Sequence, residues 1–398
     1  MTSCVCNQIL KCVDRKIPSI SVCKNKEKLF IDKKNETMYK HIINKKHKIG
    51  EPPYSKYWEK IKKRTNPYEL IHTTHSNKNM SVADYIPLSR SYFKMWEMLK
   101  RYNLLSEYKI PIVTVHLAEG PGGFIEATQY YRREYYDYRY GITLRSTDGE
   151  VPGWSSSKKF LKRNKNVEIS YGSDKTGNLY KINNIIHFVD NVGRNSAEFV
   201  TADGGFDFSV DFNNQERLFY RLLLCEVVTA LGVQKRGGTF VCKIFDIFHR
   251  FTYEILYILY NLYDEVIIDK PLTSRPANSE KYIIARGFRG ISIVYLKQLQ
   301  DIVLHWNDDI ISILEGPICE KFINDVTIFN NRFNEYQSKC IDKTLRIISE
   351  KYSLEQLEEI RKQQCICAVE WCNKYEQRIN RNCFVLKKYY NWRLLRRD

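Results

Sequence analysis

The sequence has no run of about 18 consecutive apolar residues, the length that a helix needs to cross a bilayer, which argues against a membrane-spanning protein. Its first residues, MTSCVCNQILKCVDRK, lack a basic start followed by an apolar core, so we expect no secretory signal. It contains neither an internal repeat nor a low-complexity segment. These absences favour a globular chain, and its 398 residues allow one large domain with appendages, or two domains.

The paired CxxC spacing of zinc ribbons and fingers is also missing, although the chain has twelve cysteines. Without an export signal we expect reduced thiols, and Cys225 and Cys242 lie in apolar runs that predict core positions. Two looser groups keep a zinc site open as an alternative to no metal: Cys4, Cys6, Cys12 and Cys23 near the start, and Cys365, Cys367 and Cys372 near the end.

What the sequence has in excess is positive charge. The 63 Lys and Arg residues outnumber the 46 Asp and Glu residues, which gives a formal net charge of +17. Such an excess favours a polyanionic partner, with nucleic acid first and an anionic membrane surface second. A genome biased toward lysine codons is the alternative explanation.

The pattern changes twice along the chain. Residues 1–55 are polar and basic and predict a basic arm or a small module. Residues 56–295 form the predicted central domain, which opens with a helical segment that Ser89 can cap. Residues 296–398 predict a helical extension that ends in the basic and aromatic tail VLKKYYNWRLLRRD.

Strand and helix patterns alternate through the centre. Strand signals cover 110–120, 140–146, 197–205, 238–245, 264–271 and 280–288, and helix signals cover 124–136, 213–233 and 251–263. This alternation predicts an α/β fold with a mainly parallel sheet and helices on both faces.

A glycine-rich segment, HLAEGPGGFIEA, joins the first of these strands to its helix. Glycines there let backbone amides approach a ligand at the sheet edge where open α/β folds bind ligands. The order departs from the GxGxxG fingerprint of dinucleotide sites, which argues against an oxidoreductase. Pro121 stiffens the turn and removes one amide donor, which suits a nucleoside better than a pyrophosphate. A purely structural turn is the alternative.

A lysine interrupts the apolar strand segment GGTFVCKIFDIF. Lys243 is costly there unless its amine is needed. Asp203 ends one strand, Glu280 begins another, and Lys94 lies on the helix before the sheet. The carboxyl ends of parallel strands line one crevice, which Glu280 joins if its strand runs antiparallel. Each residue alone could be a turn cap, a surface acid or a snorkelling lysine, and Lys243 is the least easily dismissed because it interrupts an apolar strand.

Five motifs follow one another in order: LAEGPGGFIEA, YGITL, TADGGFDF, LLLCEVVTALGVQKRGGTFVCKIFDIF and KPLTSRPANSEKYIIARGF. From about Asn66 to Gly287 the chain thereby resembles the FtsJ-type family of RNA ribose 2′-O-methyltransferases, most closely its cap-specific mRNA branch of eukaryotes and large DNA viruses. The resemblance implies a Rossmann-like, S-adenosyl-L-methionine-dependent fold with a seven-stranded sheet and a helical C-terminal extension.

The resemblance also implies functional residues. The family's catalytic tetrad maps onto Lys94, Asp203, Lys243 and Glu280, with Lys94 matched through the shorter motif SRSYFKMWE. The implied S-adenosylmethionine site comprises Glu119, Gly120, Pro121, Gly122, Gly123, Phe124, Asp174 and Asp203. In the segment YGSDKTGNL, however, Asn178 stands where the family pattern has an acid, which weakens the adenosine assignment of that loop.

Methyl transfer to a ribose 2′-hydroxyl needs a base of matched pKa. We expect burial and the second positive charge of Lys94 to lower the pKa of Lys243, so that Lys243 is the general base. Glu280 would orient the two lysines, and Asp203 would hold the geometry of Lys243 beside the cofactor. No metal is required.

The implied substrate is capped mRNA, methylated on its first or second transcribed nucleotide. Tyr68 offers a stacking face and Glu69 an acceptor for methylguanine, with a packed turn as the alternative. Arg275 and Ser279 would line the RNA channel, and the basic arm and tail would hold phosphates.

Two other readings stay open. One is a ribosomal or transfer RNA 2′-O-methyltransferase with the same tetrad, and the other is a non-catalytic RNA-binding or polymerase-accessory subunit on the same fold. We expect capped mRNA and other capping or transcription proteins as partners and no membrane. The expected location is the cytoplasm or nucleus, or, for a viral chain, the host cytoplasm or the virion.

Overall fold

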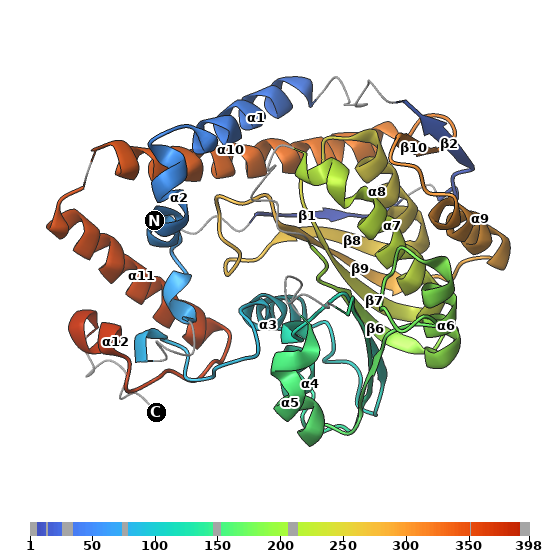
Figure 1. The fold of residues 1–398 in the computed structure, drawn as a ribbon, viewed down its shortest axis with the longest axis horizontal. Coiled ribbons are helices and arrows are strands. Elements are labelled where there is room, and N and C mark those ends of the chain that lie inside the picture. The colour runs from blue at the N-terminus through green and yellow to red at the C-terminus, as the bar shows by residue number, and fades with distance from the viewer. Residues whose placement is uncertain are drawn as a thin grey trace.

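The computed structural model describes residues 6–12, 15–25, 35–73, 79–145, 153–205, 214–350 and 352–390. Within these ranges the main sheet has eight strands in the order β1-β8-β9-β7-β6-β3-β4-β5 (Figure 1). Their bounds are β1 Cys6–Leu10, β3 Val113–Leu117, β4 Tyr138–Ile142, β5 Val167–Ser170, β6 Ala197–Ala202, β7 Gln234–Ile244, β8 Tyr263–Lys270 and β9 Lys281–Phe288. Strands β2 (Ile20–Lys24) and β10 (Ile310–Leu314) pair separately.

The five strands from β5 to β7 are joined by parallel pairs, and β9, β8 and β1 continue the sheet with antiparallel pairs. The predicted mainly parallel α/β sheet is therefore confirmed. The parallel part of the sheet begins with β3, continues outward to β4 and β5, and then crosses to β6 on the other side of β3. This reversal creates a switch point between β3 and β6, the place where such sheets bind ligands.

The helices are α1 Glu36–Gly50, α2 Tyr54–Thr65, α3 Ser91–Tyr102, α4 Gly123–Tyr131, α5 Lys158–Arg163, α6 Ile182–Val192, α7 Gln215–Val233, α8 Arg250–Leu262, α9 Ile293–Leu304, α10 Glu320–Glu350, α11 Leu354–Lys374 and α12 Phe384–Tyr389, with the short 3-10 helices η1 Glu69–Ile71 and η3 Trp154–Ser157. None of the helices in the described ranges is both long enough and apolar enough to cross a bilayer.

Helices cover both faces of the sheet (Figure 1). One apolar core packs α6, α7, α8 and α9 against one face, and a second packs α3, α4 and α11 against the other. In β7, Phe240 and Cys242 belong to the first core and Val241 to the second, as the two-residue period of a strand requires. A strand buried on both faces reads as a continuous apolar run, which is why Lys243 stands out in the sequence.

The described part of residues 1–55 is built into this body. The prediction of seven strands is corrected to eight, because β1 pairs antiparallel with the outer edge of β8. Helix α1 lies along α10 (Figure 1), and the two share a small core with Trp58 and Phe248. The Lys46 ammonium, buried on α1, lies 2.5 Å from the Asp246 carboxylate just after β7. The sequence did not show these contacts because they join segments 200 residues apart.

The C-terminal segment is also corrected in one respect: it contains the strand β10 besides its helices. Helix α11 closes the second core against α3. The Trp371 indole N–H donates to Glu97 at 3.0 Å, and the Trp96 indole N–H donates to the Tyr375 carbonyl at 2.7 Å.

Candidate active site

The carboxyl ends of the strands bring the predicted tetrad to one edge of the sheet. Asp203 follows the last residue of β6, and Lys243 is next to last in β7. Glu280 directly precedes β9, whose antiparallel pairing with β7 places its start at the same edge. Lys94 reaches this edge from the first turn of α3.

One half of the tetrad is an ion pair between Lys94 and Glu280. The Lys94 Nζ donates to Glu280 Oε2 at 2.8 Å, and the Ser274 hydroxyl donates to the other carboxylate oxygen at 2.6 Å. Burial alone raises the pKa of Glu280, but the ammonium groups of Lys94, Lys243 and Lys270 outweigh it and hold that pKa well below its usual range. Glu280 is therefore an anion that the positive charges of three lysines stabilise.

The other half joins Lys243 to Asp203. The Lys243 Nζ lies 3.3 Å from Asp203 Oδ1 and donates to the Asp203 carbonyl oxygen at 2.7 Å. The two side chains are only 12% and 13% exposed. The Tyr282 hydroxyl donates to the same Asp203 oxygen at 3.0 Å, so a neutral group as well as the cation holds this carboxylate.

The expected pKa shift of Lys243 is wrong in direction for the ligand-free chain. Burial lowers the pKa of Lys243, as expected, but the carboxylates of Asp203, Glu280 and Glu226 outweigh it, and the net shift is upward. Lys94 does not counteract this, because its ammonium is held by Glu280. Lys243 is accordingly a cation at neutral pH in this structure.

Glu226, on α7, is the acid that sequence reasoning missed. Burial raises its pKa to about 8. Its Oε1 accepts from the Gly204 amide at 3.1 Å, and a Cβ on Gly204 would lie 2.2 Å from the same oxygen. A Cβ on Gly205 would lie 3.0 Å from the Lys243 amine. The signal was present in the sequence, since an acid interrupts the apolar run LLLCEVV much as Lys243 interrupts its strand.

The glycine loop after β3 is shaped by packing. Gly122 has φ +105°, a left-handed conformation that favours glycine, and a Cβ there would lie 2.4 Å from the Trp154 ring. A Cβ on Gly123 would lie 2.1 Å from the Ser91 hydroxyl. Both glycines thus let α4 and Trp154 approach closely beside the tetrad helix α3. Pro121 is fixed through its carbonyl oxygen, which accepts from the Ser157 hydroxyl, and Gly120 lies between it and Glu119.

Two side chains of the predicted cofactor segment, those of Glu119 and Phe124, are buried in the protein interior. Glu119 is buried and accepts from the Thr201 hydroxyl and, at 3.2 Å, from the Ile125 amide, so it ties the loop to β6. Phe124 is fully buried, with its ring 5.7 Å from that of Tyr282.

Asp174 is held by its own loop. Its carboxylate accepts from Thr176, Lys181 and Asn184, and the Lys181 ammonium is the main reason that the pKa of Asp174 is lowered. This bond network closes the segment, for which local hydrogen bonding of an aspartate is sufficient, and the contact of the exposed Asp174 with the adenosine stays a prediction.

A nucleoside ligand fits the remaining groups. The Trp154 indole N–H is buried without a hydrogen-bond partner among the described residues, and its ring packs on Gly122 of the glycine loop. A buried donor without an acceptor is costly unless a ligand supplies one. Asp203 offers a carboxylate at the same edge for a cationic group. Trp154 was missed because its loop carries no strand or helix pattern.

Two of the four predicted RNA contacts are corrected. Tyr68 is 7% exposed and packs in the second core, so it offers no stacking face. Ser279 is 3% exposed and its hydroxyl donates to Gln215. Glu69 and Arg275 do come together: the Arg275 guanidinium donates to both oxygens of Glu69 at 3.1 and 3.0 Å, and Arg90 lies 3.3 Å from the same carboxylate.

The ten cysteines whose side chains the structure describes are free thiols, and the side chains of Cys4 and Cys6 are not among them. Cys225 and Cys242 are buried in the first core, which confirms their prediction as core residues. Cys365 and Cys372 are buried in the second core. No group of three or more metal-ligating side chains occurs in the described part of the chain, and Cys4 lies outside it.

Comparisons with known proteins identify a family and several relatives. A family model described as FtsJ-like methyltransferase matches residues 87–288. The chain is similar to cap-specific mRNA (nucleoside-2′-O-)-methyltransferase 1 of Mus musculus, with 34% identity over 239 residues. Proteins of the same name from Homo sapiens and Dictyostelium discoideum are each 32% identical, over 247 and 283 residues.

These matches cover part of each protein. The aligned segment is 57% of this chain for the mouse and human proteins and 64% for the Dictyostelium protein. It spans 28% of the mouse and human relatives and 35% of the Dictyostelium relative.

Proposed function

Because the chain belongs to the FtsJ-like methyltransferase family, we propose that it methylates the ribose 2′-hydroxyl of the first or second transcribed nucleotide of capped mRNA, with S-adenosylmethionine as the methyl donor. The observation that carries this proposal is the meeting of Lys94, Asp203, Lys243 and Glu280 at one sheet edge, as two linked ion pairs. Relatives named as cap-specific mRNA methyltransferases support the choice of substrate.

The proposed base is Lys243. In the transfer, a bond forms between the ribose O2′ and the methyl carbon as the sulfur–methyl bond breaks, and the hydroxyl proton moves to the Lys243 amine. S-adenosylmethionine supplies the methyl group on a cationic sulfonium, and this positive charge beside Asp203 would lower the pKa of Lys243. Because the upward shift keeps the amine protonated in the free chain, Lys243 would first release its own proton to solvent, which the lowered pKa would favour, and then accept the hydroxyl proton.

The other residues position this base. The Asp203 carbonyl and carboxylate hold the Lys243 amine, and Tyr282 keeps the carboxylate oriented. Glu280, fixed by Lys94 and Ser274, lies close enough to influence the charge of Lys243 and would accept a hydrogen bond from the incoming hydroxyl. The Trp154 indole N–H and the glycine loop would hold the cofactor.

The test is transfer of a labelled methyl group to short RNAs of one sequence. Capped and uncapped RNAs should be compared, along with a capped RNA that has a 2′-deoxy sugar at the first nucleotide. We expect label on the capped ribose substrate only, or also on the deoxy substrate if the second nucleotide is methylated, as nuclease digestion would show. Equal labelling of uncapped RNA would favour a ribosomal or transfer RNA substrate. Absence of transfer and of cofactor binding would favour a non-catalytic subunit.

A further inference from the structure

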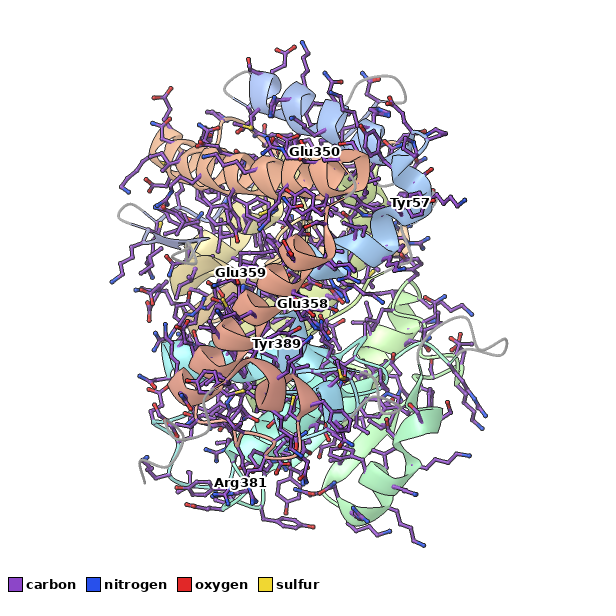
Figure 2. The ribbon with its side chains drawn as sticks, turned by 90° about the vertical axis from the view of Figure 1, so that its left-hand side faces the viewer. Tyr57, Glu350, Glu358, Glu359, Arg381 and Tyr389 are labelled. Carbon is purple, nitrogen blue, oxygen red and sulfur yellow. The ribbon has the colours of Figure 1, made fainter. Side chains whose placement is uncertain are left out.

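A basic pocket lies outside the segment that the family model matches. Its volume is about 440 Å³, and it opens between α2, α11 and α12. Three of its cationic side chains come from α2 and one from α11, and Tyr389 at the end of α12 forms an aromatic wall; the cations are Lys60, Lys63, Arg64 and Arg361. Figure 2 shows this face, with Glu358 of α11 and Tyr389 close together.

The positive charge of this pocket is not compensated within the described chain. None of its four cations forms an ion pair with a described residue, whereas Lys62 on the same helix pairs with Glu59. The acid on the pocket wall, Glu358, forms an ion pair with Lys388 at 2.5 Å. Burial lowers the pKa of Arg361, and the charge of Arg64 lowers it further. Like charges held together in this way are relieved by a bound anion.

The walls of the pocket are fixed to one another. Gln364 on α11 uses its side-chain amide to donate to the carbonyl oxygens of Lys63, Arg64 and Asn66, at 2.8, 3.1 and 2.6 Å. These are carbonyls at the end of α2 that have no helical partner. The Arg361 guanidinium donates a hydrogen bond to the side-chain oxygen of the same Gln364 at 3.4 Å. The cations of α2 and α11 are therefore presented as one unit.

A short bonded route leads from this pocket to the tetrad. Asn66, at the end of α2, donates to Glu69 at 2.7 Å, and Glu69 pairs with Arg275 and Arg90. Arg90 donates to the Thr273 carbonyl at 3.4 Å, next to the Ser274 that holds Glu280. These bonds run through the protein interior and connect the wall of the pocket to the residues that hold the tetrad.

We propose that this pocket binds the phosphate backbone of RNA at a point away from the nucleotide that is methylated. Two guanidinium groups and two ammonium groups match the chemistry of phosphodiester oxygens, and Tyr389 gives a base a surface to pack on. An acidic peptide would use the cations but not the aromatic wall. The inference depends on the proposed function for the identity of the polymer.

The test reverses two charges that have no structural partner. Lys60→Glu with Lys63→Glu is compared with a control double variant, Lys109→Glu with Lys297→Glu, which changes the net charge equally at exposed sites elsewhere. Binding of a fluorescent capped RNA of about 20 nucleotides is followed by anisotropy at several salt concentrations. We expect the pocket variant to weaken binding at least about tenfold and to reduce the slope of log affinity against log salt by about 2, and the control to change neither.

A second variant and a competitor complete the design. Tyr389→Ala should weaken binding without changing the salt slope, because it removes stacking and no charge. Polyglutamate should compete poorly with RNA at equal charge concentration. The inference is overturned if the pocket and control variants behave alike, if RNA binding is unchanged, or if polyglutamate competes as well as RNA.

The experiments distinguish failure of the proposed methyltransferase activity from failure of the RNA-binding inference. Binding is measured without methyl transfer, so a wild-type chain that transfers no methyl group but loses RNA binding in the pocket variant contradicts only the proposed activity. Thermal unfolding of the lysine variants, expected to match the wild type, verifies that the exposed substitutions leave the fold intact, and that of Tyr389→Ala sets the temperature at which its binding is measured, because Tyr389 packs partly on the second core.

Discussion

Replacing Lys243 by alanine tests the central electrostatic argument. The variant removes the amine that would accept the hydroxyl proton, and loss of a positioned base costs about 100-fold or more in turnover. A factor of 100 corresponds to about 2.7 kcal/mol of transition-state stabilisation. We expect binding of S-adenosylmethionine to persist, because Trp154 and the glycine loop are untouched.

The same substitution leaves Asp203 without its ion-pair partner. Removing one member of a buried pair costs about 3–5 kcal/mol. We expect the low end of this range, about 3 kcal/mol, because both side chains keep slight exposure and Tyr282 still donates to Asp203 at 3.0 Å. Turnover must therefore be measured at a temperature where denaturant titration shows the variant to be folded.

The pH dependence supplies the decisive readout. The carboxylates around Lys243 raise its pKa, so the wild-type rate should increase with pH through the alkaline range, as the amine loses its proton. In the alanine variant this dependence should disappear. A matched control is Lys235→Ala on the same strand. The Lys235 ammonium lies 2.6 Å from the Glu198 carboxylate, outside the active site, so its loss should leave turnover unchanged. Near-wild-type methylation by the Lys243 variant, or an unaltered pH profile, would refute the assignment.

Three further outcomes are expected. Lys94→Ala should lower methyl transfer at least about tenfold and destabilise the fold at neutral pH, because Glu280 loses the ammonium 2.8 Å away. The destabilisation measured in urea titrations should shrink as the pH falls below about 4, where Glu280 protonates in the unfolded chain. Glu226→Gln should gain stability relative to the wild type by about 1.4 kcal/mol per pH unit between pH 5 and about 8. The reason is that the buried acid, with a pKa of about 8, ionises at a lower pH in the unfolded chain than in the folded one. A stability difference that does not vary with pH would contradict this. Gly123→Ala should reduce the free energy of unfolding by about 1–3 kcal/mol, since its Cβ would lie 2.1 Å from the Ser91 hydroxyl, and a variant as stable as the wild type would show that α3 and α4 can separate freely.

The sequence predicted the sheet well because its signals are local. Each strand carries its own apolar run, and a strand buried on both faces makes a misplaced charge conspicuous, as at Lys243. The edge strand β1 escaped notice, since it is only five residues long and is defined by its pairing with β8. Pairing over more than 250 residues of separation leaves no trace in the local pattern.

The same distinction between local pattern and long-range packing applies to the candidate active site. The sequence alone determined which residues stand at strand ends, because the order of strands and turns places Asp203, Lys243 and Glu280 there. Only the tertiary structure decided the direction in which the pKa of Lys243 shifts, because that pKa depends on the summed field of carboxylates from three separate segments, including Glu226 on α7. It likewise decided that Tyr68 is buried and that Glu119 faces the core, since burial is set by what packs on a residue and not by the residue itself.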